Sequence, residues 1–123
     1  MNRKKILIVD DQRGVRELLK AILNDFSLQE ASDGLEAITI IQQWSPDLII
    51  IDMKMPVLDG GATIKKMATL NLKTKPKVLL MTAATEINDA KIADLNVDQW
   101  INKPFDLEEL REKVILLLEK HGD

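Results

Sequence analysis

The sequence predicts an α/β fold, a flavodoxin-like, doubly wound (βα)5 domain whose five-stranded parallel sheet has the order 2-1-3-4-5. Three observations predict this fold class. Short apolar runs without polar alternation recur along the chain, helical apolar patterns separate them, and the strongest runs each end on a polar residue. Strands of a parallel sheet are covered on both faces, so they appear as continuous apolar runs, and their alternation with helices favours right-handed crossovers.

Five segments are expected to form the strands. The three strong apolar runs are Ile6–Val9, Leu48–Ile51 and Val78–Met81. Two weaker segments, Leu28–Ala31 and Asp98–Ile101, contain fewer apolar residues. We therefore expect the strong runs in the middle of the sheet and the weak ones at its edges.

Helical patterns lie between the strands. Apolar residues repeat at steps of three and four in three segments: Val15, Leu18, Leu19, Ile22, Leu23 and Phe26; Leu35, Ile38, Ile41 and Trp44; and Leu107, Leu110, Val114, Leu117 and Leu118. Such spacing places them on one face of a helix. Asp106 followed by Glu109 resembles a capping box at the start of the last helix. Segments 60–70 and 85–95 have less regular patterns but suitable lengths, so they complete five βα units.

Composition limits the class of protein. The chain has 123 residues, of which 46% are hydrophobic and 30% charged, which suits one domain with one core. The net charge of −3 argues against nucleic acid as a partner, and the absence of cysteine excludes disulfides and thiolate chemistry. The first apolar run is too short for a signal peptide, and no run could span a membrane. A cytoplasmic location is expected.

Polar residues follow the strands at the edge where open α/β sheets build their sites. The first strand is followed by Asp10 and Asp11, the third by Asp52, the fourth by Thr82 and the fifth by Lys103. Taken singly, each has an ordinary explanation as a helix cap, a solvated strand end, a turn residue or a surface lysine. The strand order instead brings the three aspartates together, with Thr82 and Lys103 beside them.

Such a grouping of carboxylates has a chemical consequence. Two unit charges ~4 Å apart repel by about 4 kcal/mol at an effective dielectric of 20, so the cluster needs a counter-charge. Mg²⁺ suits hard oxygen ligands, and Lys103 adds a fixed positive charge. Metal, ammonium and hydroxyl together form a site for a phosphoryl group, with Asp52 as the carboxylate nucleophile.

This arrangement resembles the receiver domain of two-component response regulators along essentially the whole chain. The residues that carry the resemblance are Asp10-Asp11, Asp52 within "DMKMPVLDG", Thr82-Ala83 and Lys103-Pro104-Phe105. The resemblance implies that Asp52 accepts a phosphoryl group from the phosphohistidine of a sensor histidine kinase. It also implies a Mg²⁺ site formed by Asp11, Asp52 and the backbone carbonyl of Lys54, with Asp10 acting mainly through water.

The resemblance further implies a two-state switch. Lys103 would pair with the phosphoryl group and Thr82 would hydrogen-bond to it. Movement of Thr82 would let an aromatic residue near the fifth strand turn inward, and that residue is Trp100, where the family more often has Tyr or Phe. The implied protein is not an enzyme for a separate substrate, because it catalyses only its own phosphorylation and slow dephosphorylation.

A more specific likeness is to the stand-alone receiver of the sporulation phosphorelay. It rests on "KILIVDDQ", Gly14, Arg16, Leu18-Leu19, "DMKMP", "MTA" and "KPFD". Gln12, beside the acidic pair, belongs to this likeness. The segments "VDQWINKPF" and "AATEIND" diverge from it, and because such surfaces choose partners, the identity of the partner is not carried over.

Residues 1–123 are expected to form a single receiver domain without an output domain, and to be monomeric. The signal would then pass by phosphotransfer or by contact with a phosphotransferase or effector protein. The expected contact residues are Gln12, Arg13, Val15, Leu18, Pro104 and Phe105, because exposed apolar residues near a charged site suit a transient interface. The alternative is that Val15 and Leu18 belong to the core.

Two other functions stay open from the residues alone. A phosphatase of the haloacid-dehalogenase type also uses a strand-end aspartate, but it normally has a second acid two residues later, where this chain has Lys54. A receiver-fold binding module that is not phosphorylated is the second alternative, and a receiver cut from a longer regulator is a third possibility. His121, the only histidine, lies at the end of the last helix, where a cation interacts favourably with the helix dipole. We expect this structural role rather than a role as phosphodonor or metal ligand.

Overall fold

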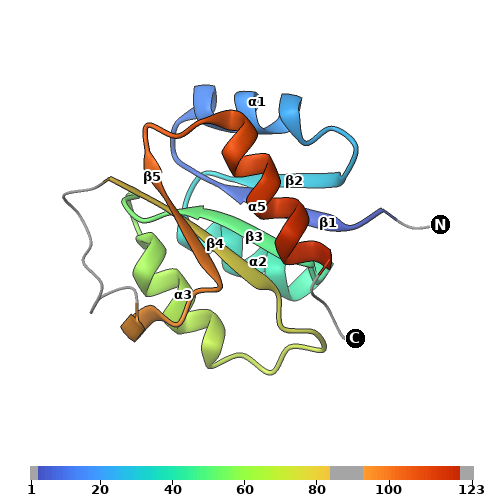
Figure 1. The fold of residues 1–123 in the computed structure, drawn as a ribbon. Helices are drawn as coiled ribbons and strands as arrows, with labels where there is room; N and C mark the ends of the chain where they lie inside the picture. The colour runs from blue at the N-terminus through green and yellow to red at the C-terminus, as the bar shows by residue number, and fades with distance from the viewer. Residues whose placement is uncertain (1–2, 84–92, 120–123) are drawn as a thin grey trace.

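A computed structural model describes residues 3–83 and 93–119 and shows the expected sheet. Five parallel strands are hydrogen-bonded in the order β2-β1-β3-β4-β5, as Figure 1 shows. The flavodoxin-like fold class predicted from the sequence is confirmed. Of the helix expected over 85–95, only residues 93–95 are described, and they are helical; His121 lies outside the described residues.

The boundaries of the elements follow the sequence patterns closely. The strands are β1 (Lys5–Val9), β2 (Ser27–Ala31), β3 (Leu48–Asp52), β4 (Lys77–Ala83) and β5 (Gln99–Lys103). The helices are α1 (Arg13–Ile22), α2 (Gly34–Trp44), α3 (Gly60–Ala68) and α5 (Leu107–Glu119). The two weak strands, β2 and β5, lie at the edges of the sheet, as expected.

Alternate residues of each central strand belong to one of two apolar clusters, which lie on opposite faces of the sheet. On one face Ile8, Ile50 and Leu79 meet α1 and α5 through residues such as Leu19 and Val114. On the other face the odd-numbered residues of β1 and β3 and the even-numbered residues of β4 meet α2 and α3. Helices cover both faces of the sheet (Figure 1), and in such open α/β sheets ligands bind outside the carboxyl ends of the strands.

One expected helix face is wrong in detail. Leu35 was expected on the apolar face of the second helix, but its side chain is 54% exposed. The buried face of α2 begins instead at Gly34, where an added Cβ would lie 2.0 Å from Thr63 Oγ1 and 2.5 Å from the Leu58 carbonyl oxygen. Close packing of this glycine against the α3 region sets the rotation of α2 and turns Leu35 outward.

The first helix is also shorter than its apolar pattern. It ends at Ile22, with Leu23 as its C-cap, so Phe26 lies beyond the helix, in the turn before β2. Both side chains still belong to the α1/α5 side of the core, Leu23 fully buried and Phe26 partly. The apolar spacing therefore identified core residues correctly and overestimated the helix length.

Aspartates begin three of the helices. Asp33 and Asp59 each accept a backbone N–H bond of 2.8 Å at the start of α2 and α3. Asp106 accepts the backbone N–H of Glu108 at 2.8 Å and thereby caps α5, as its position before the helix predicted. Such caps satisfy donors that the helix itself leaves unpaired.

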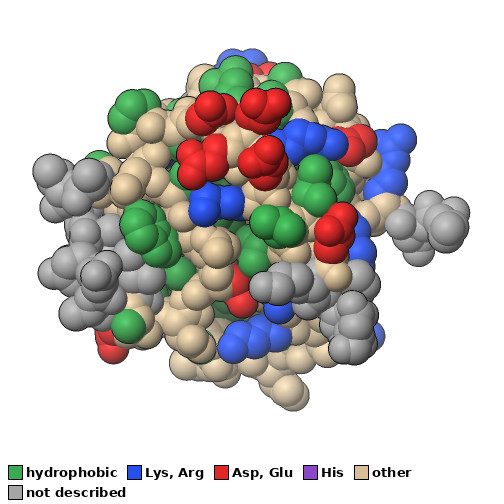
Figure 2. All heavy atoms as spheres, in the orientation of Figure 1, with side chains coloured by type: hydrophobic (Ala, Val, Ile, Leu, Met, Phe, Trp, Pro, Cys, Tyr) green, Lys and Arg blue, Asp and Glu red, His purple; other side chains and the backbone are tan. Residues whose placement is uncertain are grey.

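The surface of α5 is acidic near its start. Figure 2 shows acidic side chains gathered over the N-terminal half of this helix. The exposed acidic residues there are Asp106, Glu108, Glu109 and Glu112. Negative charge is favourable at this end of a helix, where the dipole is positive.

Among the described residues, helices long and apolar enough to cross a bilayer are absent.

Candidate functional site

Three aspartates converge at the carboxyl ends of β1 and β3. The two strands are direct neighbours, with Val9 opposite Ile51, so Asp10 and Asp52 emerge side by side. One carboxylate oxygen from each of Asp10, Asp11 and Asp52 lies within 4.8 Å of the others. Asp10 is fully buried, Asp52 is 5% exposed, and Asp11 is exposed to solvent. The parallel sheet thus produces the acidic cluster that the strand ends predicted.

Lys103 supplies the counter-charge from the far edge of the sheet. Its Nζ lies 3.1 Å from Asp52 Oδ1 and 3.2 Å from Asp10 Oδ2. Since Lys103 is the last residue of β5, its side chain reaches past β4 to the two acids. A single ammonium group therefore bridges two of the three carboxylates.

Burial and neighbouring negative charges make Asp52 a weaker acid than an ordinary aspartate. Loss of solvent and repulsion from Asp10 and Asp11 raise the pKa of Asp52 to about 6, although Lys103 opposes the shift. Burial lowers the pKa of Lys103, but the carboxylates of Asp52 and Asp10 outweigh it and raise that pKa overall. Lys103 consequently stays charged, and the cluster has excess negative charge that a cation would offset.

The acids open into a small pocket of about 380 Å³. Its lining residues are Asp11, Gln12, Asp52, Lys54, Met55, Pro56, Ala83 and Lys103. Carboxylate oxygens and the nearby main chain of Lys54 are the hard oxygen donors that Mg²⁺ prefers, so the donor set fits this ion. The pocket also has room beside Asp52 and Lys103 for a tetrahedral anion.

Thr82 of β4 precedes Ala83, which lines this pocket, and Trp100 lies on the neighbouring strand β5, three residues before Lys103. Thr82 is fully buried one residue before Ala83, and its hydroxyl donates to the Ala83 carbonyl oxygen at 3.1 Å. Trp100 lies opposite Leu80 in β5, is partly buried, and packs on the apolar cluster that faces α2 and α3. It also lines a cavity of about 420 Å³ with Pro104, so there is space beside its ring.

Of the expected partner-contact residues, Gln12 lines the pocket. Gln12, Arg13, Leu18 and Pro104 are exposed. Val15 and Phe105 are partly buried against the same apolar cluster, on the face of the sheet that α1 and α5 cover. Leu18, 48% exposed, belongs to the surface rather than to the core.

No role for Arg16 was predicted from the residues, but the structure places its guanidinium group against the main chain of Asp10. Its Nη1 donates to the backbone carbonyl oxygen of Asp10 at 2.7 Å, and its Nε donates to Glu30 Oε1 at 2.7 Å. The sequence signals for Arg16 are its place in the likeness to the sporulation receiver and a cation about one helical turn after the acidic pair. Since the acceptor is a main-chain oxygen, residue types alone could not indicate the contact.

A doubly wound sheet with three acids and a lysine at its carboxyl edge defines a class of phosphate-handling α/β proteins. The family model described as "Response regulator receiver domain" matches residues 6–115. The chain belongs to the response regulator receiver family. The resemblance drawn from the sequence motifs is therefore confirmed.

Individual relatives agree with the family. The chain is 38% identical over 117 residues to the sporulation initiation phosphotransferase F of Bacillus subtilis, covering 93% of each protein. It is 34% identical over 119 residues to the response regulator MprA of a Mycobacterium species. That match covers 94% of the chain but 51% of MprA, so the chain spans about half the length of this relative.

Solved structures show the same fold. A putative response regulator from Chloroflexus aurantiacus has a TM-score of 0.88 at 28% identity, covering 97% of this chain and all of that one. The chemotaxis response regulator CheY4 of Vibrio cholerae has a TM-score of 0.86 at 28% identity, covering 95% of this chain and all of that one. Both similarities extend over the whole sheet and its helices.

Proposed function

We propose that this receiver domain accepts a phosphoryl group on Asp52 from the phosphohistidine of a sensor histidine kinase. The observation that supports this most strongly is the contact of Lys103 Nζ with both Asp52 and Asp10 inside a three-aspartate cluster. In the transfer, a carboxylate oxygen of Asp52 forms a bond to phosphorus as the P–N bond breaks, and the imidazole leaves with the bonding electron pair.

The residues of the site have separate tasks in this reaction. Asp52 is the nucleophile, and Lys103 pairs with the negative charge of the phosphoryl group. Asp11, Asp52 and the backbone carbonyl of Lys54 would hold Mg²⁺, with Asp10 acting through water. The ion, when bound, neutralises the charge of the phosphoryl oxygens.

The partners follow from the surface and the relatives. The exposed acidic side chains of α5 repel nucleic acid, which supports a protein partner. The Bacillus subtilis relative is named a phosphotransferase of sporulation initiation. By analogy, we propose that the phosphoryl group passes from Asp52 to a further phosphotransferase in a relay. A phosphatase of the haloacid-dehalogenase type is disfavoured because Lys54 stands where its second acid is needed.

The Asp52→Asn variant tests this function. It should lose all phosphorylation from a small phosphodonor or from a kinase, because an amide oxygen is a poor nucleophile. The control is Asp59→Asn, the same change on the next aspartate along the chain, where Asn still caps α3. Incorporation of labelled phosphate is measured in Mg²⁺ and in EDTA. The wild type and Asp59→Asn should incorporate label in Mg²⁺ but not in EDTA, and Asp52→Asn should incorporate none in either. Label retained in Asp52→Asn would exclude the proposed acceptor.

The proposed switch couples Thr82 to Trp100. Phosphorylation would draw the Thr82 hydroxyl away from the Ala83 carbonyl and free space for the Trp100 ring. In a Trp44→Phe background, Mg²⁺ with a small phosphodonor should change the fluorescence of Trp100. The change should disappear in Thr82→Ala, while Mg²⁺ alone still binds. Fluorescence that responds equally in Thr82→Ala would contradict the coupling.

A further inference from the structure

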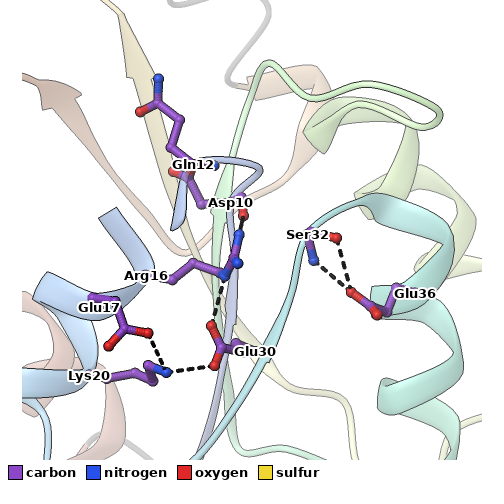
Figure 3. Close-up of polar contacts among 8 residues, drawn as sticks. All are labelled: Asp10, Gln12, Arg16, Glu17, Lys20, Glu30, Ser32 and Glu36. Atoms are coloured by element: carbon purple, nitrogen blue, oxygen red, sulfur yellow. Dashed lines mark hydrogen bonds and ion pairs between the residues drawn. The ribbon is translucent and has the colours of Figure 1, made fainter. Parts of the chain in front are cut away.

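Arg16 links the acidic pair to the edge strand of the sheet. Figure 3 shows its guanidinium group between Asp10 and Glu30. Arg16 Nη1 donates to the Asp10 carbonyl oxygen at 2.7 Å, and Arg16 Nε donates to Glu30 Oε1 at 2.7 Å. The Arg16 side chain is only 15% exposed. A cation in α1 thus holds the main chain that carries the first two acids of the site.

The peptide groups of Asp10 are held from β2 on both sides. Its backbone N–H donates to the Ala31 carbonyl oxygen at 3.1 Å, and its carbonyl oxygen is bound through Arg16 to the neighbouring Glu30. The Asp10 carboxylate is held as well, because Oδ1 accepts the backbone N–H of Gln12 at 2.8 Å and Oδ2 contacts Lys103. Arg16 is the one side chain in this set that acts on the Asp10 main chain.

The charge of Arg16 is offset where it lies. Glu30 pairs with both Arg16 and Lys20, with Lys20 Nζ 2.6 Å from Glu30 Oε2 and 2.8 Å from Glu17 Oε2 (Figure 3). The four side chains carry two positive and two negative charges. Arg16 can therefore place a strong donor beside a cation site without adding net positive charge to it.

From these contacts we infer that Arg16 is a positioning residue for the phosphorylation site, which rests on the function proposed above. By fixing the Asp10 carbonyl, it sets the direction in which Asp10 and Asp11 leave β1 and enter the pocket. Its effect is exerted through the backbone, not through contact with metal or phosphate. Groups that orient the ligands of a metal commonly change its affinity 10- to 100-fold when removed.

The sign of one measurement separates positioning from simple charge. Arg16→Met removes a positive charge near a cation site, so a purely electrostatic role predicts tighter Mg²⁺ binding. A positioning role predicts weaker binding, by roughly 10-fold or more. Titration calorimetry with MgCl2 on the full chain gives the answer. Affinity that is unchanged or higher in Arg16→Met would overturn the inference.

Arg111→Met is the matched control. Arg111 also joins a backbone carbonyl to a carboxylate. Its Nη1 donates to the Ile22 carbonyl oxygen at 3.0 Å, and its guanidinium group pairs with Asp25 at 2.9 Å. Its loss removes the same charge and the same kinds of bond from α5. Mg²⁺ affinity should stay at the wild-type value in this control. The conservative Arg16→Lys, which keeps the charge and one donor group, should recover part of the affinity.

A second measurement needs neither metal nor phosphate. In EDTA, hydrogen exchange at the Gln12 amide reports whether the Asp10 carboxylate is still held in place. Exchange at this amide should accelerate in Arg16→Met and stay unchanged in Arg111→Met. Equal protection of Gln12 in both variants would refute the inference. Failure of Asp52 to accept phosphate in the wild type would instead refute the proposed function, and the exchange result would still decide the role of Arg16.

Discussion

Asp52 is an almost fully buried carboxylate beside two other acids and one ammonium group. Its charge is costly without a cation, because burial and repulsion from Asp10 and Asp11 raise its pKa to about 6. That the acids and Lys103 gather at one point could be predicted from the strand ends. The degree of burial could not, since both Asp10 and Asp11 follow β1 and only Asp10 is enclosed. Their individual roles stay predictions.

The raised pKa of Asp52 predicts how the stability of the metal-free protein depends on pH. Asp52 ionises near pH 3.8 in the unfolded chain and near pH 6 in the folded one. The folded state therefore binds the extra proton between these values, and its stability falls as the pH rises from about 4 to 6. The full cost, on the order of 3 kcal/mol, is present above pH 6.

Asp52→Asn should remove this cost. In urea unfolding with EDTA, the stability gained by the variant over the wild type should grow from pH 4 to pH 6 and then level off. Most other acids titrate in both proteins and cancel in the difference. Added Mg²⁺ at pH 7 should stabilise the wild type more than the variant. A gain that is constant from pH 4 to pH 7 would contradict the raised pKa.

Two helices, α2 and α3, pack closely against neighbouring backbone because each begins with a glycine. Gly60, the first residue of α3, donates its backbone N–H to the Met53 carbonyl oxygen at 2.8 Å, just after Asp52. An added Cβ there would lie 2.2 Å from the Asp52 carbonyl oxygen. The sequence predicted a helix over this stretch from its length, but the apolar pattern could not show this approach. The outward position of Leu35 was missed for the same reason, because packing at Gly34 decides it.

Gly60→Ala should therefore destabilise the fold and disturb the site. The backbone of Asp52 cannot move away cheaply, so we expect a loss of about 1–3 kcal/mol in the free energy of unfolding. Gly14→Ala in α1 is the control, because an added Cβ meets no atom within 4 Å there. It should be neutral or stabilise by up to about 1 kcal/mol. Denaturant unfolding of both variants measures the difference, and equal stability would be the contrary result.

The described part of the chain forms two apolar clusters, one on each face of the sheet, and the three-aspartate site lies at the carboxyl edge between them. Leu18 and Leu35 are similarly exposed, at 48% and 54%, yet they lie in helices on opposite faces of the sheet. The helix that carries Leu18, α1, lies on the same face of the sheet as Phe105, through residues such as Leu19 and Val15. The sequence predicted Leu18 as a contact residue while leaving a core position open, and the structure places it at the surface. Its use by a partner stays a prediction.

Leu18→Ala should slow phosphotransfer from a sensor histidine kinase by about fivefold or more, the effect of losing about 1 kcal/mol at an interface. Phosphorylation by a small phosphodonor should be unchanged, because that reaction needs only the pocket. Leu35→Ala truncates the same side chain at similar exposure on the other face and should leave both rates unaltered. Initial rates with the two donors check this. Equal slowing in both variants would place the kinase elsewhere.

By itself, the sequence determined the strands, the polar residues that follow four of them, and therefore the edge of the sheet where the site lies. These features depend on local runs of residue types and on the general rule for parallel sheets. Only the tertiary structure decided which acid is buried, how α2 is rotated, and that Arg16 holds Asp10. The first two depend on contacts between distant segments, such as Lys103 with Asp10, 93 residues apart. Arg16 binds the carbonyl oxygen of Asp10, only six residues earlier, while it pairs with Glu30 of β2. No local pattern of residue types encodes the geometry of these contacts.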